Sequence, residues 1–214
     1  YGGRPGYVPI TVDGQTGWQT MYSLTRALQI ELGITTPVND FGPTTLAQLT
    51  FQVGNVTAAT WTTKPGIFSI LQAALWCKGY WGGSFGTYDA NVGSGITTMK
   101  AAIGLSTTIS VEPKVFKSLL TMDAYTVVNS GTAAVRAVQQ WLNGTYLDRR
   151  DFFVIPCDGL YSRNVQEGLV YAIQYEIGMA DGTANGNFGP GTQQGIRDYG
   201  NVSLGSVDGA RRMV

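Results

Sequence analysis

The segments NDFGPTTLAQL at residues 39–49 and GNFGPGTQQGI at residues 186–196 decide how this sequence is interpreted. Both contain Phe-Gly-Pro, then a Thr within two residues, then a stretch typical of a helix. A shared tripeptide can arise by chance in a chain of 214 residues. The residues around the two segments are therefore more informative, because a repeated unit predicts both the fold and the class of function.

The residues upstream of the two segments also match. Residues 13–34 and 158–179 both open with Asp-Gly and align without a gap. Within them Gln29 aligns with Gln174, and the apolar positions and the closing Gly correspond as well. A weaker copy at 84–105 keeps the small and apolar positions. These matches indicate one unit that occurs about three times in tandem.

The downstream parts of the copies correspond too, since Pro43, Pro113 and Pro190 align. A short segment of the form L/V-Q-x-x-L precedes the second and third copies, at 71–75 and 138–142. A turn is predicted at the glycine that follows each of these segments, Gly79 and Gly144. The unit therefore has three parts, a short helix, a longer helix and a helix opened by proline.

Local patterns support this interpretation of the unit. Leu24, Leu28 and Leu32 share one helical face at i, i+4 and i+8, and Gly33 favours the left-handed conformation that ends a helix. A proline is tolerated in the first turn of a helix. We expect a mainly α protein of tandem small three-helix units, with short extended segments in the loops such as FFVIPC at 152–157.

The predicted units have defined boundaries. The first covers 1–55 and lacks its first helix, the second and diverged unit covers 66–122, and the best-matching third covers 131–200. Residues 201–214 resemble the start of a further helix or a truncated linker. Each unit is near the size at which a core becomes marginal, so packing between units is expected to add stability.

The composition excludes several classes of function. The chain has 14 Lys and Arg against 14 Asp and Glu, so it has no basic field that would attract nucleic acid. It has no apolar run long enough to span a membrane. It has no His, which excludes Ser-His-Asp catalysis and His-ligated zinc sites, and we expect no metal or cofactor. Cys77 and Cys157 either form one disulfide outside the cell or remain two buried thiols.

The motifs together resemble the bacterial peptidoglycan-binding domain of three short helices, which is often attached to cell-wall hydrolases. The third copy matches best, through VQQWLNG, CDGLYS, AIQYEIGM and GNFGPGTQQGI. The resemblance implies non-catalytic binding to peptidoglycan at the bacterial cell wall, outside the cell. The chain would then target or anchor a secreted wall-active protein, whose glycoside-hydrolase-like domain would lie elsewhere.

The resemblance also implies a ligand, glycan or stem peptide, in a shallow groove made by the helices and their loops. Arg163 can pair with a stem-peptide carboxylate, and Tyr161 offers an apolar face and a hydroxyl. Phe41 and Phe188 are expected to be core residues, which leaves their polar neighbours to meet a ligand. The predicted ligand contacts are Asp158, Tyr161, Ser162, Arg163 and Asn187 in the third copy, and Asp13, Gln15, Trp18, Thr20 and Asp40 in the first. A structural role stays open for Asp158, whose carboxylate can cap a helix.

Two further segments have a binding and a structural interpretation. In YWGGSFGTY at 80–88, Trp81 and Phe85 either form a sugar-binding surface or cover the neighbouring core, and the second role is expected. LDRRDFF at 147–153 is expected to be a solvated turn or an ion-pair network, with anion recognition as the alternative.

Two other functions remain alternatives to wall binding. A glycan hydrolase would need two carboxylates facing each other across its substrate. Glu31 and Glu176 occupy equivalent positions of two copies, which favours a structural role for both. We therefore predict no catalytic residue and favour a protein that is not an enzyme. The chain could instead belong to a structural protein that has kept the repeat but lost the ability to bind the wall. Such a protein would self-associate through its incomplete terminal repeats.

Overall fold

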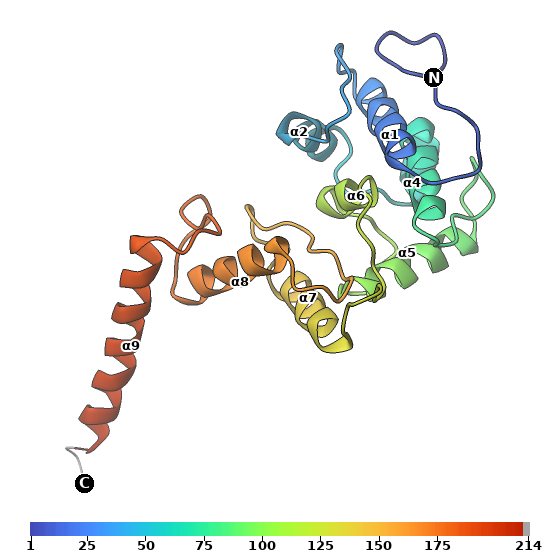
Figure 1. Ribbon diagram of the computed structural model, residues 1–214. Coiled ribbons are helices and arrows are strands. Elements are labelled where there is room, and N and C mark those ends of the chain that lie inside the picture. The colour runs from blue at the N-terminus through green and yellow to red at the C-terminus, as the bar shows by residue number, and fades with distance from the viewer. Residues whose placement is uncertain (212–214) are drawn as a thin grey trace.

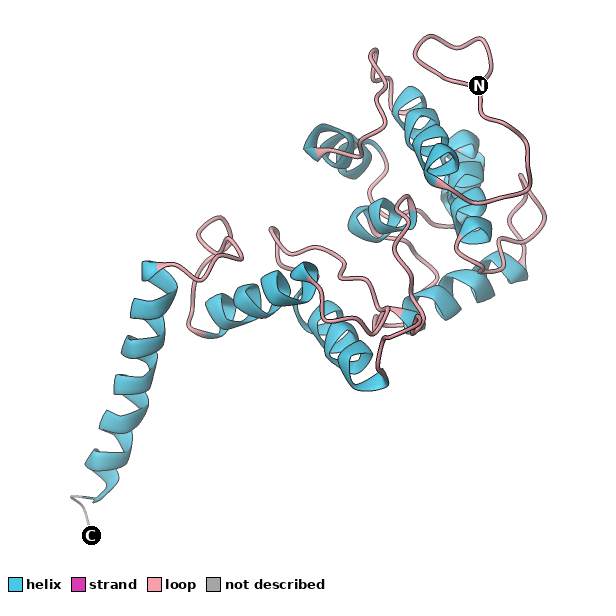
Figure 2. Ribbon diagram, viewed as in Figure 1, coloured by secondary structure: helices cyan, strands magenta, loops and turns pink. Residues whose placement is uncertain are grey.

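The computed structural model describes residues 1–211, and it describes the side chains of residues 1–200. This part of the chain consists of helices joined by loops (Figures 1 and 2). The helices are α1 (Trp18–Glu31), α2 (Pro43–Gln52), α3 (Ala58–Thr63), α4 (Pro65–Cys77), α5 (Ala90–Ala102), α6 (Pro113–Leu119), α7 (Ala133–Tyr146), α8 (Arg163–Glu176) and α9 (Pro190–Arg211). Strand-like pairing among residues 1–211 is limited to one isolated antiparallel bridge between Val56 and Val111. The predicted mainly helical fold is confirmed.

The helix starts predicted at proline and the stops predicted at Gly33 and Gly178 agree with the structure. Pro43, Pro113 and Pro190 each stand first in a helix, where a missing amide hydrogen leaves no hydrogen bond unmade. α1 and α8 end just before Gly33 and Gly178, whose φ angles of 74° and 87° are left-handed. Glycine adopts this conformation without steric cost, so it ends these helices.

The turn predicted at Gly144 is wrong, because α7 continues through this residue to Tyr146. The glycine instead allows a close approach between two segments. A Cβ atom on Gly144 would lie 2.7 Å from the carbonyl oxygen of Gly104, which follows α5. Gly79, in contrast, follows α4 with a φ of 79°, as a turn residue should.

The segment at 152–157 does not form a strand, although its sequence is rich in strand-forming residues. Its apolar side chains are buried in irregular structure, with Phe152 at 1% and Ile155 at 0% exposure. Phe152 packs against Tyr146 and Tyr171, at ring-centroid distances of 5.8 and 5.9 Å. The apolar character of the segment therefore reflects burial against α7 and α8.

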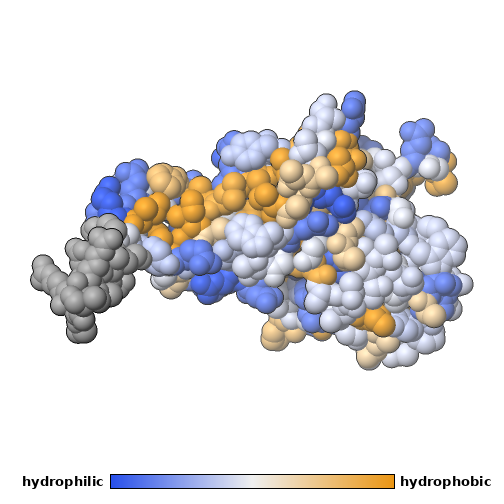
Figure 3. Space-filling model, turned by 90° about the horizontal axis from the view of Figure 1, so that it is seen from below, coloured by the Kyte–Doolittle hydropathy of each residue, from blue (hydrophilic) through white to orange (hydrophobic). Residues whose placement is uncertain are grey.

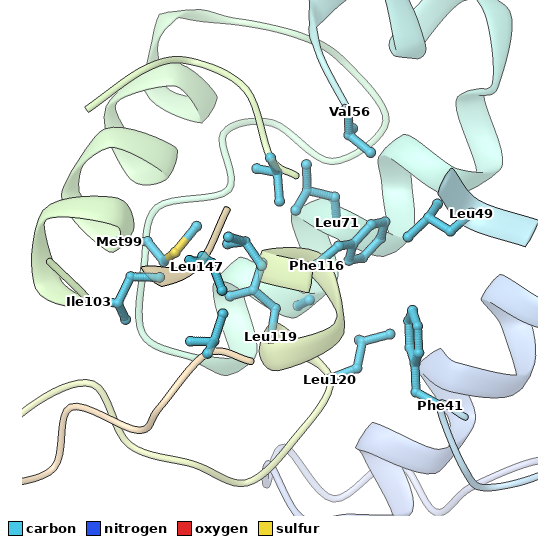
Figure 4. Packing of buried hydrophobic residues seen from close by; sticks show 14 of the residues in the cluster. Phe41, Leu49, Val56, Leu71, Met99, Ile103, Phe116, Leu119, Leu120 and Leu147 are labelled. Carbon is cyan, nitrogen blue, oxygen red and sulfur yellow. The ribbon is translucent and has the colours of Figure 1, made fainter. Parts of the chain in front are cut away.

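One hydrophobic core crosses the boundaries of the predicted units (Figure 4). It connects Phe41 and Leu49 of the first unit with Leu71 of α4 and Phe116 of α6, and extends to Leu147 after α7. α1 packs against α4, and α2 packs against α6. The predicted units therefore do not have separate cores.

The two Phe-Gly-Pro segments differ in their burial. Phe41 is buried at 6% exposure, as expected for a core residue, but Phe188 is 53% exposed, so the core role expected for Phe188 is wrong. The reason lies in the helices that follow them. α2 lies among other helices, whereas α9 leads away from them (Figure 1).

The two ends of the described chain lie far apart (Figure 1). No helix precedes α1. The N-terminal segment instead packs against α1, with the Tyr7 hydroxyl 2.6 Å from Ser23 Oγ. Residues 201–211 continue α9, and the remainder of the predicted segment 201–214 lies outside the described residues. α9 points away from α1, so it does not supply the missing helix of the first unit.

Apolar side chains gather in a band on the face that Figure 3 shows. Exposed large hydrophobic residues on α7, α8 and α9 include Val138, Ile173 and Ile196. No helix within residues 1–211 combines the length and the hydrophobicity that crossing a membrane would require.

Candidate functional site

A buried glutamine on α8 fixes the loop that leads into α9. The side-chain Nε2 of Gln174 donates hydrogen bonds to the carbonyl oxygen of Asn187 at 3.0 Å and to the Thr192 hydroxyl at 2.9 Å. Its Oε1 accepts hydrogen bonds from the backbone amides of Asn185 and Gly186. Because a buried amide needs its partners, this contact holds the loop backbone in one conformation.

Gln29 makes the corresponding contacts on α1. Its Nε2 donates to the carbonyl oxygen of Asp40 at 2.8 Å and to the Thr45 hydroxyl at 3.0 Å, and its Oε1 accepts from the amide of Val38 at 2.7 Å. Gln29 and Gln174 are each 1% exposed. The two Phe-Gly-Pro loops are thus held in the same way by residues that align in the sequence.

Lys100 occupies the corresponding position of the predicted second unit. Its Nζ donates to the carbonyl oxygen of Ser110 at 3.1 Å and forms an ion pair with Glu112 at 2.8 Å. Ser110 lies three residues before Pro113, as Asp40 and Asn187 do before their own prolines. An ion pair therefore replaces the amide contact where the sequence motifs have changed.

A buried glutamine on α7 holds the loop before α8. On α7 the Nε2 of Gln139 donates to Asp158 Oδ1 at 2.8 Å and to the Leu160 carbonyl oxygen at 3.0 Å, and Oε1 accepts from the Gly159 amide. Asp158 Oδ1 also accepts from the Leu160 amide at 2.9 Å. This carboxylate is thus engaged within the loop, so Asp158 positions its neighbours.

The remaining third-copy candidates lie at the start of α8. Tyr161 is 63% exposed, Ser162 is the N-cap residue, and Arg163 is the first helical residue and is exposed. Asp158 lies three residues before Tyr161 in the same loop and is partly exposed. The exposed guanidinium of Arg163 and the ring of Tyr161 are accessible to a ligand.

Asp40 and Asn187 lie away from the other candidates. Their carbonyl oxygens bond to Gln29 and Gln174, near the C-terminal ends of α1 and α8. Eleven residues separate Gln174 from Arg163 along α8, which corresponds to about 16 Å. The structure therefore does not bring these two candidates together with those at the helix starts.

Four first-copy candidates lie together around a pocket. Asp13, Gln15, Trp18 and Thr20 line a cavity of about 430 Å³ before and at the start of α1. Asp13 Oδ1 accepts from the Gln15 amide at 2.9 Å, and the Trp18 ring stacks on Tyr22 with centroids 5.6 Å apart. Trp18 is 54% exposed, so an aromatic face borders a mainly polar pocket.

Sequence reasoning missed a larger groove of about 1040 Å³. Its apolar lining comes from segments far apart in the sequence, including Leu46 and Phe51 of α2, Leu105 after α5, Pro113 of α6 and Leu147 after α7. Phe51 is 88% exposed. Alignment of the copies gives no signal for such a site, because only the packing of α2 and α6 near the end of α7 creates it.

Charged residues of both signs line this groove. They include the Lys100–Glu112 pair, in which Lys100 is buried, and Asp148, Arg150 and Asp151. Arg150 and Asp151 form the ion pair expected in LDRRDFF, with Nε and Oδ1 3.1 Å apart. Hydrogen bonds from Arg150 and the Gly182 amide lower the pKa of Asp151, whereas a general acid needs a raised pKa.

The aromatic residues of YWGGSFGTY differ in their exposure, since Tyr80 and Tyr88 pack against the core, whereas Trp81 and Phe85 lie largely at the surface. Trp81 is 53% and Phe85 is 69% exposed. The glycines between them are buried, because the loop backbone packs inward and turns the two rings outward.

Both cysteines are free thiols, Cys77 half-buried and Cys157 buried. Burial raises the pKa of the Cys157 thiol to about 12. Among the side chains of residues 1–200, no three Cys, Asp or Glu gather closely enough to hold a metal ion.

Comparison with known proteins finds one family model that is similar to the C-terminal part of the chain. Residues 128–208 match the family model described as FadG/YbfG, PGDB-like domain, that is, a peptidoglycan-binding-like domain. This region contains α7, α8 and most of α9, including the loop of Asp158 and Arg163.

Two proteins of Bacillus subtilis (strain 168) are similar over most of the chain. The uncharacterized protein FadG is 52% identical over 196 residues, and the uncharacterized protein YbfG is 44% identical over 195 residues. These alignments cover 91% and 90% of this chain but only 34% of FadG and 26% of YbfG. The chain thus spans about a third or less of these relatives. No solved structure matches it.

Proposed function

We propose that this chain binds bacterial peptidoglycan without altering it chemically, and that it attaches a larger wall-active protein to the cell wall. The observation that carries the proposal is the match of residues 128–208 to a peptidoglycan-binding-like domain. The short length of the chain relative to FadG and YbfG is compatible with a binding part of a larger protein. The proposed location is the outside of the cell, at the wall.

The proposal includes three tandem binding units, at 1–55, 66–122 and 131–200. The repeated contact made by Gln29, Lys100 and Gln174 supports this division, because each holds the loop before a proline-opened helix. Several weak sites on one chain would bind a polymeric wall more strongly than any one of them alone.

The proposed contacts are the exposed residues at the starts of the long helices. Arg163 would pair with a stem-peptide carboxylate through two parallel N–H donors, and Tyr161 would cover an apolar part of the ligand. In the first unit Trp18 and the polar residues of its pocket would act in the same way. Asp40 and Asn187 remain proposed contacts, but at a separate place.

The experiment is co-sedimentation of the purified chain with purified bacterial sacculi. We expect the wild type to sediment with the wall, and Arg163→Ala and Tyr161→Ala to reduce the bound fraction several-fold. Arg197→Ala is the matched control, because Arg197 is an exposed arginine on α9 whose side chain hydrogen-bonds to Gln194 within the same helix. Absence of sedimentation with the wild type would refute wall binding.

A second set of variants separates the loops from the large groove. Phe51→Ala and Arg150→Ala alter exposed groove residues and should leave the fold intact. If these two variants lose wall binding while Arg163→Ala and Tyr161→Ala keep it, the binding site is the groove and not the loops. If the turbidity of the sacculi suspension falls over time, the protein hydrolyses the wall, and the proposal of binding without chemical change is refuted.

A further inference from the structure

Two tryptophans on and after α4 form an exposed aromatic pair. The ring centroids of Trp76 and Trp81 are 4.7 Å apart, and the rings are inclined at 55°. The two residues are 45% and 53% exposed. Neither indole N–H has a hydrogen-bond partner among the described residues, whereas the N–H of Trp61 bonds to the Gly86 carbonyl oxygen. Two large rings are thus exposed together, although the N–H edge of the Trp76 ring lies beside the buried Gly82.

The loop next to this pair is held by one buried side chain. Gln72, which is 0% exposed, donates from Nε2 to the carbonyl oxygens of Gly82, Ser84 and Thr87 at 2.8, 3.0 and 2.9 Å. Its Oε1 accepts from the Gly86 amide at 2.9 Å. Four hydrogen bonds from one amide leave this loop little freedom.

Close backbone packing also fixes both tryptophans. A Cβ atom on Gly95 of α5 would lie 1.8 Å from the carbonyl oxygen of Trp81, so only glycine lets α5 approach this peptide group. A Cβ atom on Gly82 would lie 2.6 Å from Cδ1 of the Trp76 ring. The exposed rings are therefore mounted on a rigid backbone.

We propose that Trp76 and Trp81, the tryptophan platform, bind the glycan strand of peptidoglycan by stacking on its sugar rings. A pyranose ring presents a flat face of C–H groups that packs well on an indole, and the Trp81 N–H, which has no partner among the described residues, can donate to its hydroxyl or acetamido oxygens. Two rings at an angle can contact two successive sugars. Because the platform is rigid, binding would cost little conformational entropy.

The surroundings of the platform favour a neutral sugar chain over a charged stem peptide. The adjoining loop contributes Ser84, Gly86 and Thr87, which are uncharged and exposed. The nearby carboxylate of Asp89 is occupied by the backbone amides of Ser84 and Asn91. The choice of sugar rests on the proposed wall binding, but the platform is distinct from the loops and the groove discussed above.

The test uses intrinsic tryptophan fluorescence and calorimetry with three probes. These are tetra-N-acetylchitotetraose, peptide-free glycan strands released from sacculi by an amidase, and free stem peptide. We expect both glycans to bind and stem peptide to leave the platform signal unchanged. Trp76→Ala and Trp81→Ala should weaken glycan binding about tenfold or more. Trp141→Ala is the matched control, because Trp141 is a half-exposed tryptophan on α7, outside the platform. This variant should bind glycan like the wild type.

A measurement on the wild type alone covers the case in which a variant does not fold. N-bromosuccinimide oxidises exposed indoles, and mass spectrometry locates the modified residues. Glycan should protect Trp76 and Trp81 but not Trp141. Equal oxidation with and without glycan would overturn the platform, as would unchanged glycan affinity in well-folded Trp76→Ala and Trp81→Ala.

The outcomes also separate this inference from the proposed function. If the wild type sediments with intact sacculi but binds neither glycan probe, wall binding stands and the platform is refuted. If the wild type binds neither sacculi nor glycans, both are refuted. If the tryptophan variants change only the sedimentation-derived mass of the protein, the rings contact a second copy and the glycan assignment is refuted.

Discussion

Gln29 and Gln174 hold two distant loops through the same pair of donated hydrogen bonds. Each side chain reaches a carbonyl oxygen three residues before a proline and a threonine hydroxyl two residues after it. Neither side chain is exposed beyond 1%. The Phe-Gly-Pro segments that follow therefore depend on an amide on a neighbouring helix, and the next predictions concern such contacts.

Replacing Gln174 with alanine should strongly destabilise the protein. Gln174→Ala leaves backbone groups of Asn185, Gly186 and Asn187 without their side-chain partner, each at a desolvation cost. We expect a loss of about 2–4 kcal/mol in the free energy of unfolding, measured by urea denaturation. Gln166→Ala, at an exposed position of the same helix, should change it by less than about 0.5 kcal/mol.

The ion pair in the second unit should behave differently from the glutamine contacts. Lys100→Met leaves Glu112 without its cation and the Ser110 carbonyl without its donor, so we expect a loss of about 2 kcal/mol or more. The double variant Lys100→Met/Glu112→Gln should recover part of this loss, because the unpaired charge is gone. Equal stability of the single and double variants in thermal melts would contradict the account.

Two glycines on α5 should respond in opposite ways to alanine. Gly95→Ala brings a Cβ atom against the Trp81 carbonyl oxygen, and we expect a loss of about 2 kcal/mol or more. The Cβ atom of Gly93→Ala would meet the Ile109 side chain at 3.4 Å and the Tyr88 hydroxyl at 3.9 Å, which are ordinary contacts, so helix propensity should dominate and stability should stay equal or rise by up to about 1 kcal/mol. Chemical denaturation of both variants, followed by tryptophan fluorescence, measures the difference.

The two thiols should differ in reactivity and in their effect on pH dependence. Cys77 should react with a thiol reagent in the native state, whereas buried Cys157 should react only on unfolding. A Cys77→Ser variant should therefore lose the fast phase.

Burial raises the pKa of Cys157 from 9.0 to about 12, so the unfolded chain releases this proton first as the pH rises. Stability linked to this thiol is fully present below pH 9 and is lost between about pH 9 and 12. Cys157→Ser should make this loss smaller by on the order of 1 kcal/mol. Unfolding free energies of both proteins across this range test the expectation, and parallel curves would contradict it.

The helix ends marked by proline or by glycine with positive φ were predictable because they depend on local chemistry. Proline at the first turn and glycine with positive φ specify where a helix begins and ends whatever surrounds it, as at Pro43 and Gly33. Gly144 was misinterpreted because its role is tertiary. Only the approach of Gly104 explains the glycine, and no local pattern encodes that approach.

The candidate site was predictable only in part, for a similar reason. Asp13, Gln15, Trp18 and Thr20 are neighbours in the sequence and line one pocket in the structure. Asp40 and Asn187 follow the same motifs but lie a helix length away, a separation that a linear motif does not express. The large groove and the exposure of Trp81 depend on how several helices pack, which the repeat alone cannot predict.

The glutamine contacts leave the loop side chains free to vary. Gln29, Gln72 and Gln174 bind mainly backbone carbonyl and amide groups, which every non-proline residue possesses. A loop held in this way can exchange most of its side chains and keep its shape. Single substitutions in these loops can therefore change which chemical groups the surface presents while the backbone of the loops stays the same.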